Sequence, residues 1–165
     1  NVTFTAGGNL ELEGVVTSLG TLTHTLGTVT YNKGAGNQDI FADTYFELIV
    51  DNAGTKELTG AVIVNEDLTI ETGVTLDVTN GDHPINIKRD FSNNGTFTSR
   101  DGTITFNGND NQGFIPGPST FYNIIFNTTG GPLKKLIIDD GALNANPLVN
   151  LSNSASLIFS VLGLT

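Results

Sequence analysis

The stretch GTLTHTLGTVTYN at residues 20–32 recurs with few changes as GTFTSRDGTITFN at residues 95–107. Both copies fit the pattern G-T-x-T-x-x-x-G-T-x-T-x-N, in which threonine alternates with a large apolar residue. A period of two places successive side chains on opposite faces of a β-strand. The repeated stretch therefore predicts two short strands on adjacent sides of a coil, with threonine outside and the apolar residues in a core.

Similar alternating runs of three to six residues fill the rest of the chain, and no window has the apolar spacing of a helix. Gly, Asn or Asp usually follows a run. Asparagine tolerates the left-handed backbone of a sharp turn, and its amide can bond the local backbone. The sequence thus predicts an all-β protein with one kind of corner, used repeatedly after the runs that end at residues 32, 52, 65, 80, 107, 127 and 150.

The repeat extends beyond the opening stretch. NQDIF at residues 37–41 matches NQGFI at residues 111–115, and TYFELIVDN at residues 44–52 matches TFYNIIFNT at residues 120–128. The offset between the copies is about 75 residues at the start and grows along the chain, which indicates that some turns have gained residues.

About nine short strands in a copy of about 75 residues indicate three coils of three strands, with about 25 residues per coil. The predicted fold is a right-handed parallel β-helix, or β-solenoid, over residues 1–165 as a single segment, with copies at residues 20–94 and 95–165. Two tandem Ig-like β-sandwiches are the alternative. In the solenoid we expect a core that contains Leu22, Val29, Tyr31, Leu48, Val50, Ile63, Leu76, Phe97, Ile104, Phe106, Ile124, Phe126 and Leu157.

Composition narrows the function. The net charge is −10 at pH 7, whereas nucleic acids and anionic membrane surfaces select basic patches. The absence of cysteine excludes disulfides, thiolate metal ligands and a cysteine nucleophile. The longest apolar stretch, LIFSVLGL at residues 157–164, is far shorter than the ~20 residues that span a bilayer as a helix. We expect neither nucleic-acid binding nor membrane insertion.

The stretch GTFTSRDGTITFNG, followed by NQGF and TFYNIIFN, resembles repeats in very large secreted surface proteins of bacteria. The resemblance covers residues 20–52 and 95–128 well and the remainder by periodicity alone. It implies a parallel β-helix stalk of an adhesin-like protein at the cell surface or outside the cell, and such proteins are often exported by the type IX route. It carries no catalytic residues.

We therefore expect a non-enzymatic extracellular structural or adhesive segment, such as a stalk, a filament or an adhesin module. The expected partners are surface glycans, other surface proteins, and a second copy or further coils at the two ends, neither of which carries a polar cap. A polysaccharide-binding or polysaccharide-degrading β-helix is the alternative, since paired carboxylates such as Glu66 and Asp67 serve glycosidases. Neighbouring residues of a strand point to opposite faces, which favours solvated turn residues instead.

The segment NGDHPINIKRDF at residues 80–91 is the candidate binding site, because the first copy has little room for it and inserted loops often bind ligands. Its candidate residues are His83, Lys88, Arg89 and Asp90. The alternative is a longer turn in which the two basic residues balance local acid. NGNDNQG at residues 107–113 lacks the first Asp and the last Glu of a calcium loop. No cofactor is predicted beyond weak calcium binding.

Overall fold

The computed structural model is a parallel β-solenoid of about six turns. It describes residues 1–128, 136–138 and 150–161, with the side chains of residues 128 and 150–161 left aside. The described residues contain no helix, and each of their paired strands runs parallel to its neighbours. Ig-like sandwiches are antiparallel, so the solenoid prediction is confirmed and the sandwich alternative is wrong.

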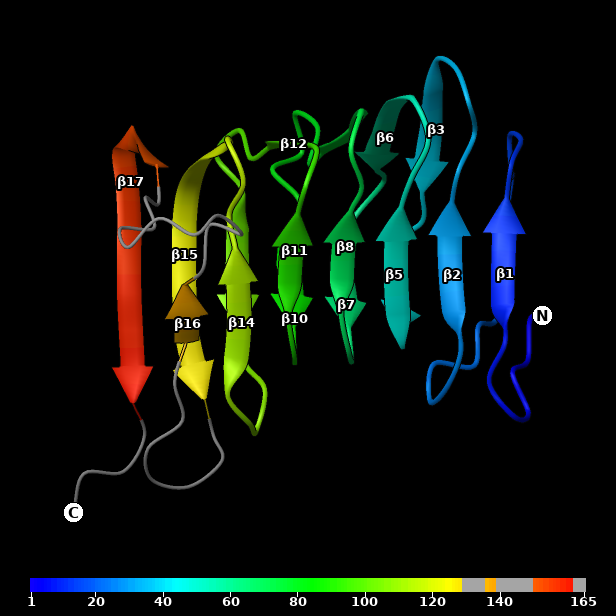
Figure 1. The fold of residues 1–165 in the computed structure, drawn as a ribbon, viewed down its shortest axis with the longest axis horizontal. Helices are drawn as coiled ribbons and strands as arrows, with labels where there is room; N and C mark the ends of the chain where they lie inside the picture. Colours follow the sequence, from blue (N-terminus) through cyan, green and yellow to red (C-terminus); the bar gives the residue numbers. More distant parts are fainter. Residues whose placement is uncertain (129–135, 139–149, 162–165) are drawn as a thin grey trace.

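The described strands form three sheets that run along the length of the molecule (Figure 1). The seven-stranded sheet has the order β1 (Asn9–Leu12), β2 (Thr28–Tyr31), β5 (Glu47–Val50), β8 (Leu68–Ile70), β11 (Phe91–Asn93), β14 (Gln112–Ile115) and β16 (Leu136–Ile138). The six-stranded sheet has the order β4 (Thr44–Tyr45), β7 (Val62–Val64), β10 (Ile85–Ile87), β13 (Thr103–Phe106), β15 (Thr120–Thr128) and β17 (Asn150–Val161). The four-stranded sheet has the order β3 (Asn37–Ile40), β6 (Gly54–Leu58), β9 (Val74–Asp77) and β12 (Thr96–Thr98).

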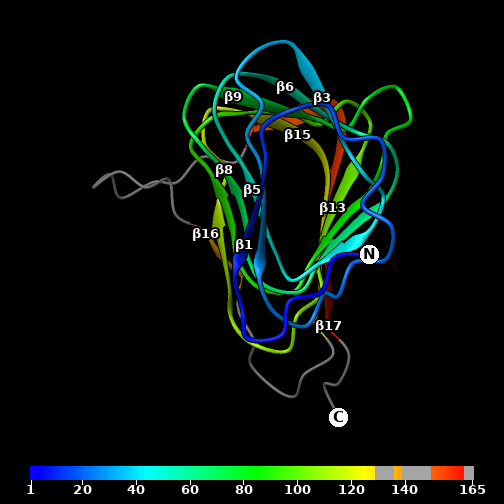
Figure 2. The same ribbon diagram turned by 90° about the vertical axis from the view of Figure 1, so that its right-hand side faces the viewer.

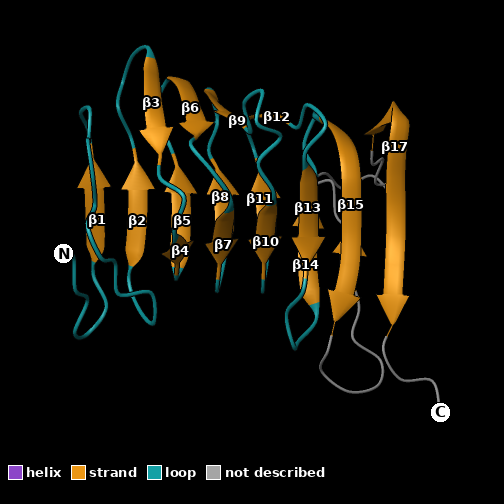
Figure 3. Ribbon diagram, turned by 180° about the vertical axis from the view of Figure 1, so that it is seen from behind, coloured by secondary structure: helices purple, strands orange, loops and turns teal. Residues whose placement is uncertain are grey.

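The chain visits the seven-, four- and six-stranded sheets in turn, and one such circuit is a coil. Seen along the axis, the coils superpose as a closed loop around a core (Figure 2), and from behind the strands stand side by side like rungs (Figure 3). Parallel strands lie about 4.8 Å apart in such a ladder, which sets the rise of each coil.

Each coil is shorter than predicted. The stacked residues Val29, Leu48, Leu68, Phe91 and Phe114 follow one another at intervals of 19 to 23 residues, whereas about 25 were expected. The cause is the strand count, because β13 is the eleventh strand after β2 although only nine were expected in that interval. With three strands per coil, eleven strands make three coils and two thirds of a fourth. The 75 residues of one repeat are therefore spread over nearly four coils, which gives about 20 residues per coil.

The two copies of the opening stretch consequently lie on different sides of the solenoid. TVTY of the first copy is β2 in the seven-stranded sheet, and TITF of the second is β13 in the six-stranded sheet. NQDI of the first copy is β3 in the four-stranded sheet, whereas QGFI of the second is β14 in the seven-stranded sheet. The copies therefore share local form and differ by a rotation about the axis.

The inward side chains form one continuous core. Most of the predicted core residues are buried, but Ile63 is 37% exposed because β7 turns Val62 and Val64 inward instead. Leu157 lies outside the described side chains. The buried residues among those predicted are Leu22, Val29, Tyr31, Leu48, Val50, Leu76, Phe97, Ile104, Phe106, Ile124 and Phe126.

Phenylalanines fill the later coils of this core. The ring of Phe91 lies 5.6 to 6.1 Å from the rings of Phe97, Phe114 and Phe121, measured between centroids. Edge-to-face and tilted contacts at this distance add to the free energy of area burial. The sequence therefore places its largest apolar side chains where three sheets converge.

The earlier coils contain buried polar groups that the sequence did not predict. Lys56 is fully buried, and its Nζ donates to the carbonyls of Lys33 and Ala53, each at 2.8 Å. In the same coils the Tyr31 and Tyr45 hydroxyls lie 2.9 Å apart, and both side chains are buried. Burial lowers the pKa of Lys56 and raises the pKa of both tyrosines. These groups persist because hydrogen bonds offset the cost of desolvation.

The corner asparagines differ in part from expectation. Asn52 adopts the left-handed backbone, with a φ of 69°, and its Nδ2 donates to the Asn32 carbonyl at 3.0 Å. Thr79, Asp82 and Arg100 adopt the same conformation elsewhere. By contrast, the amide oxygens of four other corner residues are buried without a hydrogen-bond partner in the described structure, namely Asn32, Asn65, Asn107 and Asn127. The corners thus do not share one asparagine conformation.

Candidate functional site: a polar groove at one corner

Polar residues gather at the corner where the six-stranded sheet ends and the seven-stranded sheet begins. Residues 65–67 follow β7, residues 88–90 follow β10 and residues 107–111 follow β13. The amide of Lys88 donates to the Val64 carbonyl at 3.0 Å, so the ladder continues into the corner and aligns these segments from coil to coil. We call this surface the polar corner.

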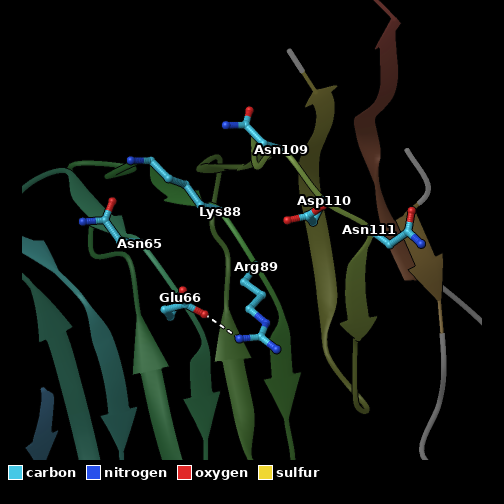
Figure 4. Close-up of a pocket in the computed structure, with 7 residues that line it drawn as sticks. All are labelled: Asn65, Glu66, Lys88, Arg89, Asn109, Asp110 and Asn111. Atoms are coloured by element: carbon cyan, nitrogen blue, oxygen red, sulfur yellow. Dashed lines mark hydrogen bonds and ion pairs between the residues drawn. The ribbon is translucent and has the colours of Figure 1, made fainter. Parts of the chain in front are cut away.

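The polar corner contains two hollows that share Glu66 and Arg89. The larger, of about 630 Å³, is lined by Asn65, Glu66, Lys88, Arg89, Asn109, Asp110 and Asn111 (Figure 4). The smaller, of about 320 Å³, is lined by Phe46, Glu47, Glu66, Asp67 and Arg89. Together they draw on successive corners of four coils, which makes a groove that runs along the solenoid axis.

An ion pair lies between the two hollows. Arg89 Nη1 lies 2.7 Å from Glu66 Oε2, and Arg89 Nε lies 3.9 Å from Asp67 Oδ1. The Arg89 side chain is 58% exposed, so solvent screens this pair and it adds little to stability. The pair holds the side chains of Arg89 and Glu66, which come from neighbouring coils, in place between the larger and the smaller hollow.

The carboxylates behind this pair are bound to backbone amides of the next coil. Asp67 Oδ1 accepts the Asp90 N–H at 3.1 Å, and Asp90 Oδ1 accepts the Gly113 N–H at 2.6 Å. Burial raises the pKa of Asp67, although the Asp90 N–H opposes that shift. Asp67 and Asp90 therefore link three successive corners and hold the segments that line the groove against one another.

A buried glutamine joins the corner between β13 and β14 to the corner between β10 and β11, one coil earlier. Gln112 is fully buried, and its Nε2 donates to the carbonyls of Ile87 and Arg89 at 3.0 and 2.9 Å. Its Oε1 accepts the Gly108 N–H at 3.0 Å. These bonds join the segment that carries Arg89 to the segment that carries residues 109–111.

Gln38 repeats this arrangement at a different corner. Its Nε2 donates to the carbonyls of Leu12 and Gly14 at 2.7 and 2.9 Å, and its Oε1 accepts the Lys33 N–H at 3.1 Å. Gln38 and Gln112 are the matching glutamines of NQDIF and NQGFI. The repeated glutamine therefore makes the same three-bond link between corners, called here a corner staple, on two different sides of the solenoid.

The structure separates the four residues that the sequence singled out. Lys88 and Arg89 line the groove, and Asp90 supports it through Gly113. His83 is half-buried at another corner, between β9 and β10, and lines neither hollow. The binding candidates thus divide into two groove residues, one supporting residue and one residue elsewhere.

Most of the groove could not be located from the sequence. Asn65 and residues 109–111 line it because β7 and β13 both pair with β10, which brings VIVN and ITFN, two coils apart, to the same corner. Glu47 and Asp110 share hollows with Glu66, so acidic neighbours that could not be located in the sequence are present in the structure. The shared apolar-Asn ending of the two runs was the available signal.

A second charged cluster lies at the corner after β9 and has a structural role. Arg100 Nε and Nη2 donate to the Asp77 carboxylate at 2.6 and 2.8 Å, and Arg100 Nη1 donates to Asn80 Oδ1 at 2.8 Å. These hydrogen bonds from Arg100 lower the pKa of Asp77. No three His, Asp or Glu side chains in the described part of the chain gather as a metal site.

No family model matches the chain, and the searches of curated proteins and of solved structures find no match. No helix of the described residues is long and apolar enough to cross a membrane.

Proposed function

We propose that this chain is a non-enzymatic structural segment of an extracellular or cell-surface protein, a stiff rod whose polar corner contacts other surfaces. The resemblance to repeats of secreted bacterial surface proteins supports an adhesin-like stalk. The observation that carries the proposal is the unbroken parallel ladder of the seven-stranded sheet, which stacks one strand per coil along the described structure (Figure 1).

The ladder explains how such a rod bears load. Backbone hydrogen bonds between parallel strands are directed along the solenoid axis, and the stacked core joins each coil to the next. Tension applied along the axis acts on all three ladders at once. Each coil then behaves as one mechanical unit of about 20 residues.

Single-molecule stretching between the two ends tests this proposal. We expect a series of unfolding steps, each lengthening the chain by about 70 Å, which is the extended length of about 20 residues. A chain that extends smoothly at low force, without steps, would contradict the rod. Digestion by protease on intact source cells would check the surface location, because an intracellular protein would be protected.

We also propose that the ends associate with a second copy or with further coils. β1 is the outer strand of the seven-stranded sheet, and Val15 in the first coil is 77% exposed. Open strand edges next to exposed apolar residues favour pairing. Sedimentation at increasing concentration should reveal assembly that Val15→Lys weakens. Assembly that Val15→Lys leaves unchanged would exclude the end that carries β1 as the site of association.

A polysaccharide-degrading enzyme is the second candidate. The raised pKa of Asp67, beside Glu66 in a hollow, is a feature of catalytic carboxylates. Against it, Asp67 accepts a backbone N–H and Glu66 pairs with Arg89, so both groups already have structural partners. Release of reducing ends from neutral or acidic polysaccharides, abolished by Asp67→Asn, would favour the enzyme over the rod.

A further inference from the structure

We propose that the polar corner binds a neutral, linear polysaccharide that lies along the solenoid axis. This proposal rests on the surface-contact role proposed above and names its ligand. The shape of the groove favours an extended ligand. Its lining begins at Phe46 and continues through the next corners to residues 109–111, three coils further on. At about 4.8 Å per coil, a groove of this kind is about 15 Å long, which suits several units of an extended chain.

The hydrogen-bonding chemistry of the groove suits hydroxyl groups. The Lys88 side chain is exposed, forms no hydrogen bond or ion pair within the described part of the chain, and points away from the Glu66–Arg89 pair (Figure 4). Its ammonium is a donor only, whereas the Glu66 and Asp110 carboxylates in the same hollow are acceptors only. A sugar hydroxyl both donates and accepts, so a polyhydroxy ligand can use donors and acceptors that lie side by side.

The charge of the groove selects against acidic ligands. The two hollows are lined by four carboxylates and two cations, namely Glu47, Glu66, Asp67, Asp110, Lys88 and Arg89. Since the whole chain also carries a net charge of −10, uronates, sulfated glycans and nucleic acids are repelled. The two cations in turn disfavour a bare metal ion. A neutral saccharide remains the ligand that this mixture of charges accepts.

One end of the groove provides an apolar surface. Phe46 is half-buried and lines the smaller hollow, next to Glu47 and Arg89. An aromatic side chain presents a large apolar area, which can cover the carbon-bound face of a sugar ring. The smaller hollow therefore suits the ring of one sugar, and the larger suits the hydroxyls of the following units.

Affinity electrophoresis of the full chain in native gels tests the proposal. Gels contain either a soluble neutral polysaccharide, from a panel of a mixed-linkage β-glucan, a galactomannan and a xyloglucan, or polygalacturonate as the acidic probe. We expect at least one neutral polymer to retard the protein and polygalacturonate to leave its mobility unchanged. Lys88→Ala should weaken retardation about tenfold, because it removes the donor that no other described residue uses.

Lys33→Ala is the matched control, since it removes the same charge from a different corner and should retain wild-type retardation. Thermal unfolding of each variant verifies folding. Three results would overturn the proposal: no retardation by any neutral polymer, retardation by polygalacturonate that depends on Lys88, or equal retardation of the Lys88 and Lys33 variants. Each leaves the stepwise mechanical unfolding of the rod intact, so failure of the ligand is distinguishable from failure of the proposed function.

Discussion

Replacing Gln112 by leucine tests whether a buried side chain holds the polar corner together. Leucine has a similar volume but cannot form the three hydrogen bonds of Gln112. The buried Gly108 N–H would lose its acceptor at a cost of about 2 kcal/mol, and the Ile87 and Arg89 carbonyls would lose a donor at about 1 kcal/mol each. Burial of leucine returns about 1 kcal/mol, which leaves a net loss of about 3 kcal/mol.

Equilibrium unfolding in urea measures this loss. For a protein of this size the dependence on urea is about 2–3 kcal/mol/M, so the midpoint should fall by about 1–1.5 M with an unchanged slope. Gln38→Leu should lose a similar amount, because Gln38 makes the same three kinds of bond. The two glutamines are more than three coils apart, about 18 Å along the axis, so the double variant should show additive losses.

A loss below about 1 kcal/mol for both single variants would refute this reasoning, because it would mean that the corner backbone finds other partners. A large loss at Gln112 with none at Gln38 would show that the two staples are not equivalent, despite their equal hydrogen bonds. A changed slope would instead indicate loss of two-state unfolding.

Three further predictions concern other parts of the solenoid. Asp77→Ala should lower the free energy of unfolding by about 2–3 kcal/mol at pH 7, since the carboxylate accepts bonds from Arg100 and Thr79. The Arg100 bonds lower the pKa of Asp77 in the folded protein. The stabilisation that Asp77 gives the folded state is therefore complete above its unfolded pKa of about 3.9 and is lost as the pH falls through its folded pKa. The free energies of unfolding of wild type and variant, measured in urea, should converge in strong acid. Phe91→Ala should cost about 3–5 kcal/mol by calorimetry, and a cost under 1 kcal/mol would indicate that the core collapses into the cavity. Burial lowers the pKa of Lys56 in the folded protein, so the wild type should gain stability as the pH rises towards the unfolded pKa of about 10.4. Urea unfolding at pH 8 and pH 10 should show this gain for the wild type and not for Lys56→Met.

The site was only partly predictable from the chain. Lys88 and Arg89 were identified because two basic residues stand together in an acidic sequence with an apparent insertion. Asn65 was identified only as a corner residue and Glu66 only as part of a carboxylate pair, and Asp110 lies in a stretch with no complete motif. Nothing in the sequence placed them together, and they reach the groove because corners two coils apart align. His83 belongs to the same sequence segment as Lys88, yet it lies at the corner before β10, whereas Lys88 lies at the corner after it.

The core shows the same division. Alternation identified the buried residues of TVTY and TITF, where threonine marks the outer face. In AVIV at residues 61–64 every residue is apolar, so the pattern does not indicate whether the even-numbered or the odd-numbered residues face the core. The register with β10 decides it, because Val62 and Val64 stack on Ile85 and Ile87.

By itself, the sequence determined the all-β class and the alternation of inward and outward side chains, since both depend on residues only a few positions apart. Only the tertiary structure decided the length of a coil, the side on which each copy of the opening stretch lies, and the residues that line the groove. These depend on the summed lengths of all preceding strands and corners, which place paired residues of the seven-stranded sheet 19 to 23 positions apart from β1 to β14. A difference of a few residues per coil, negligible locally, rotates the second copy onto another face.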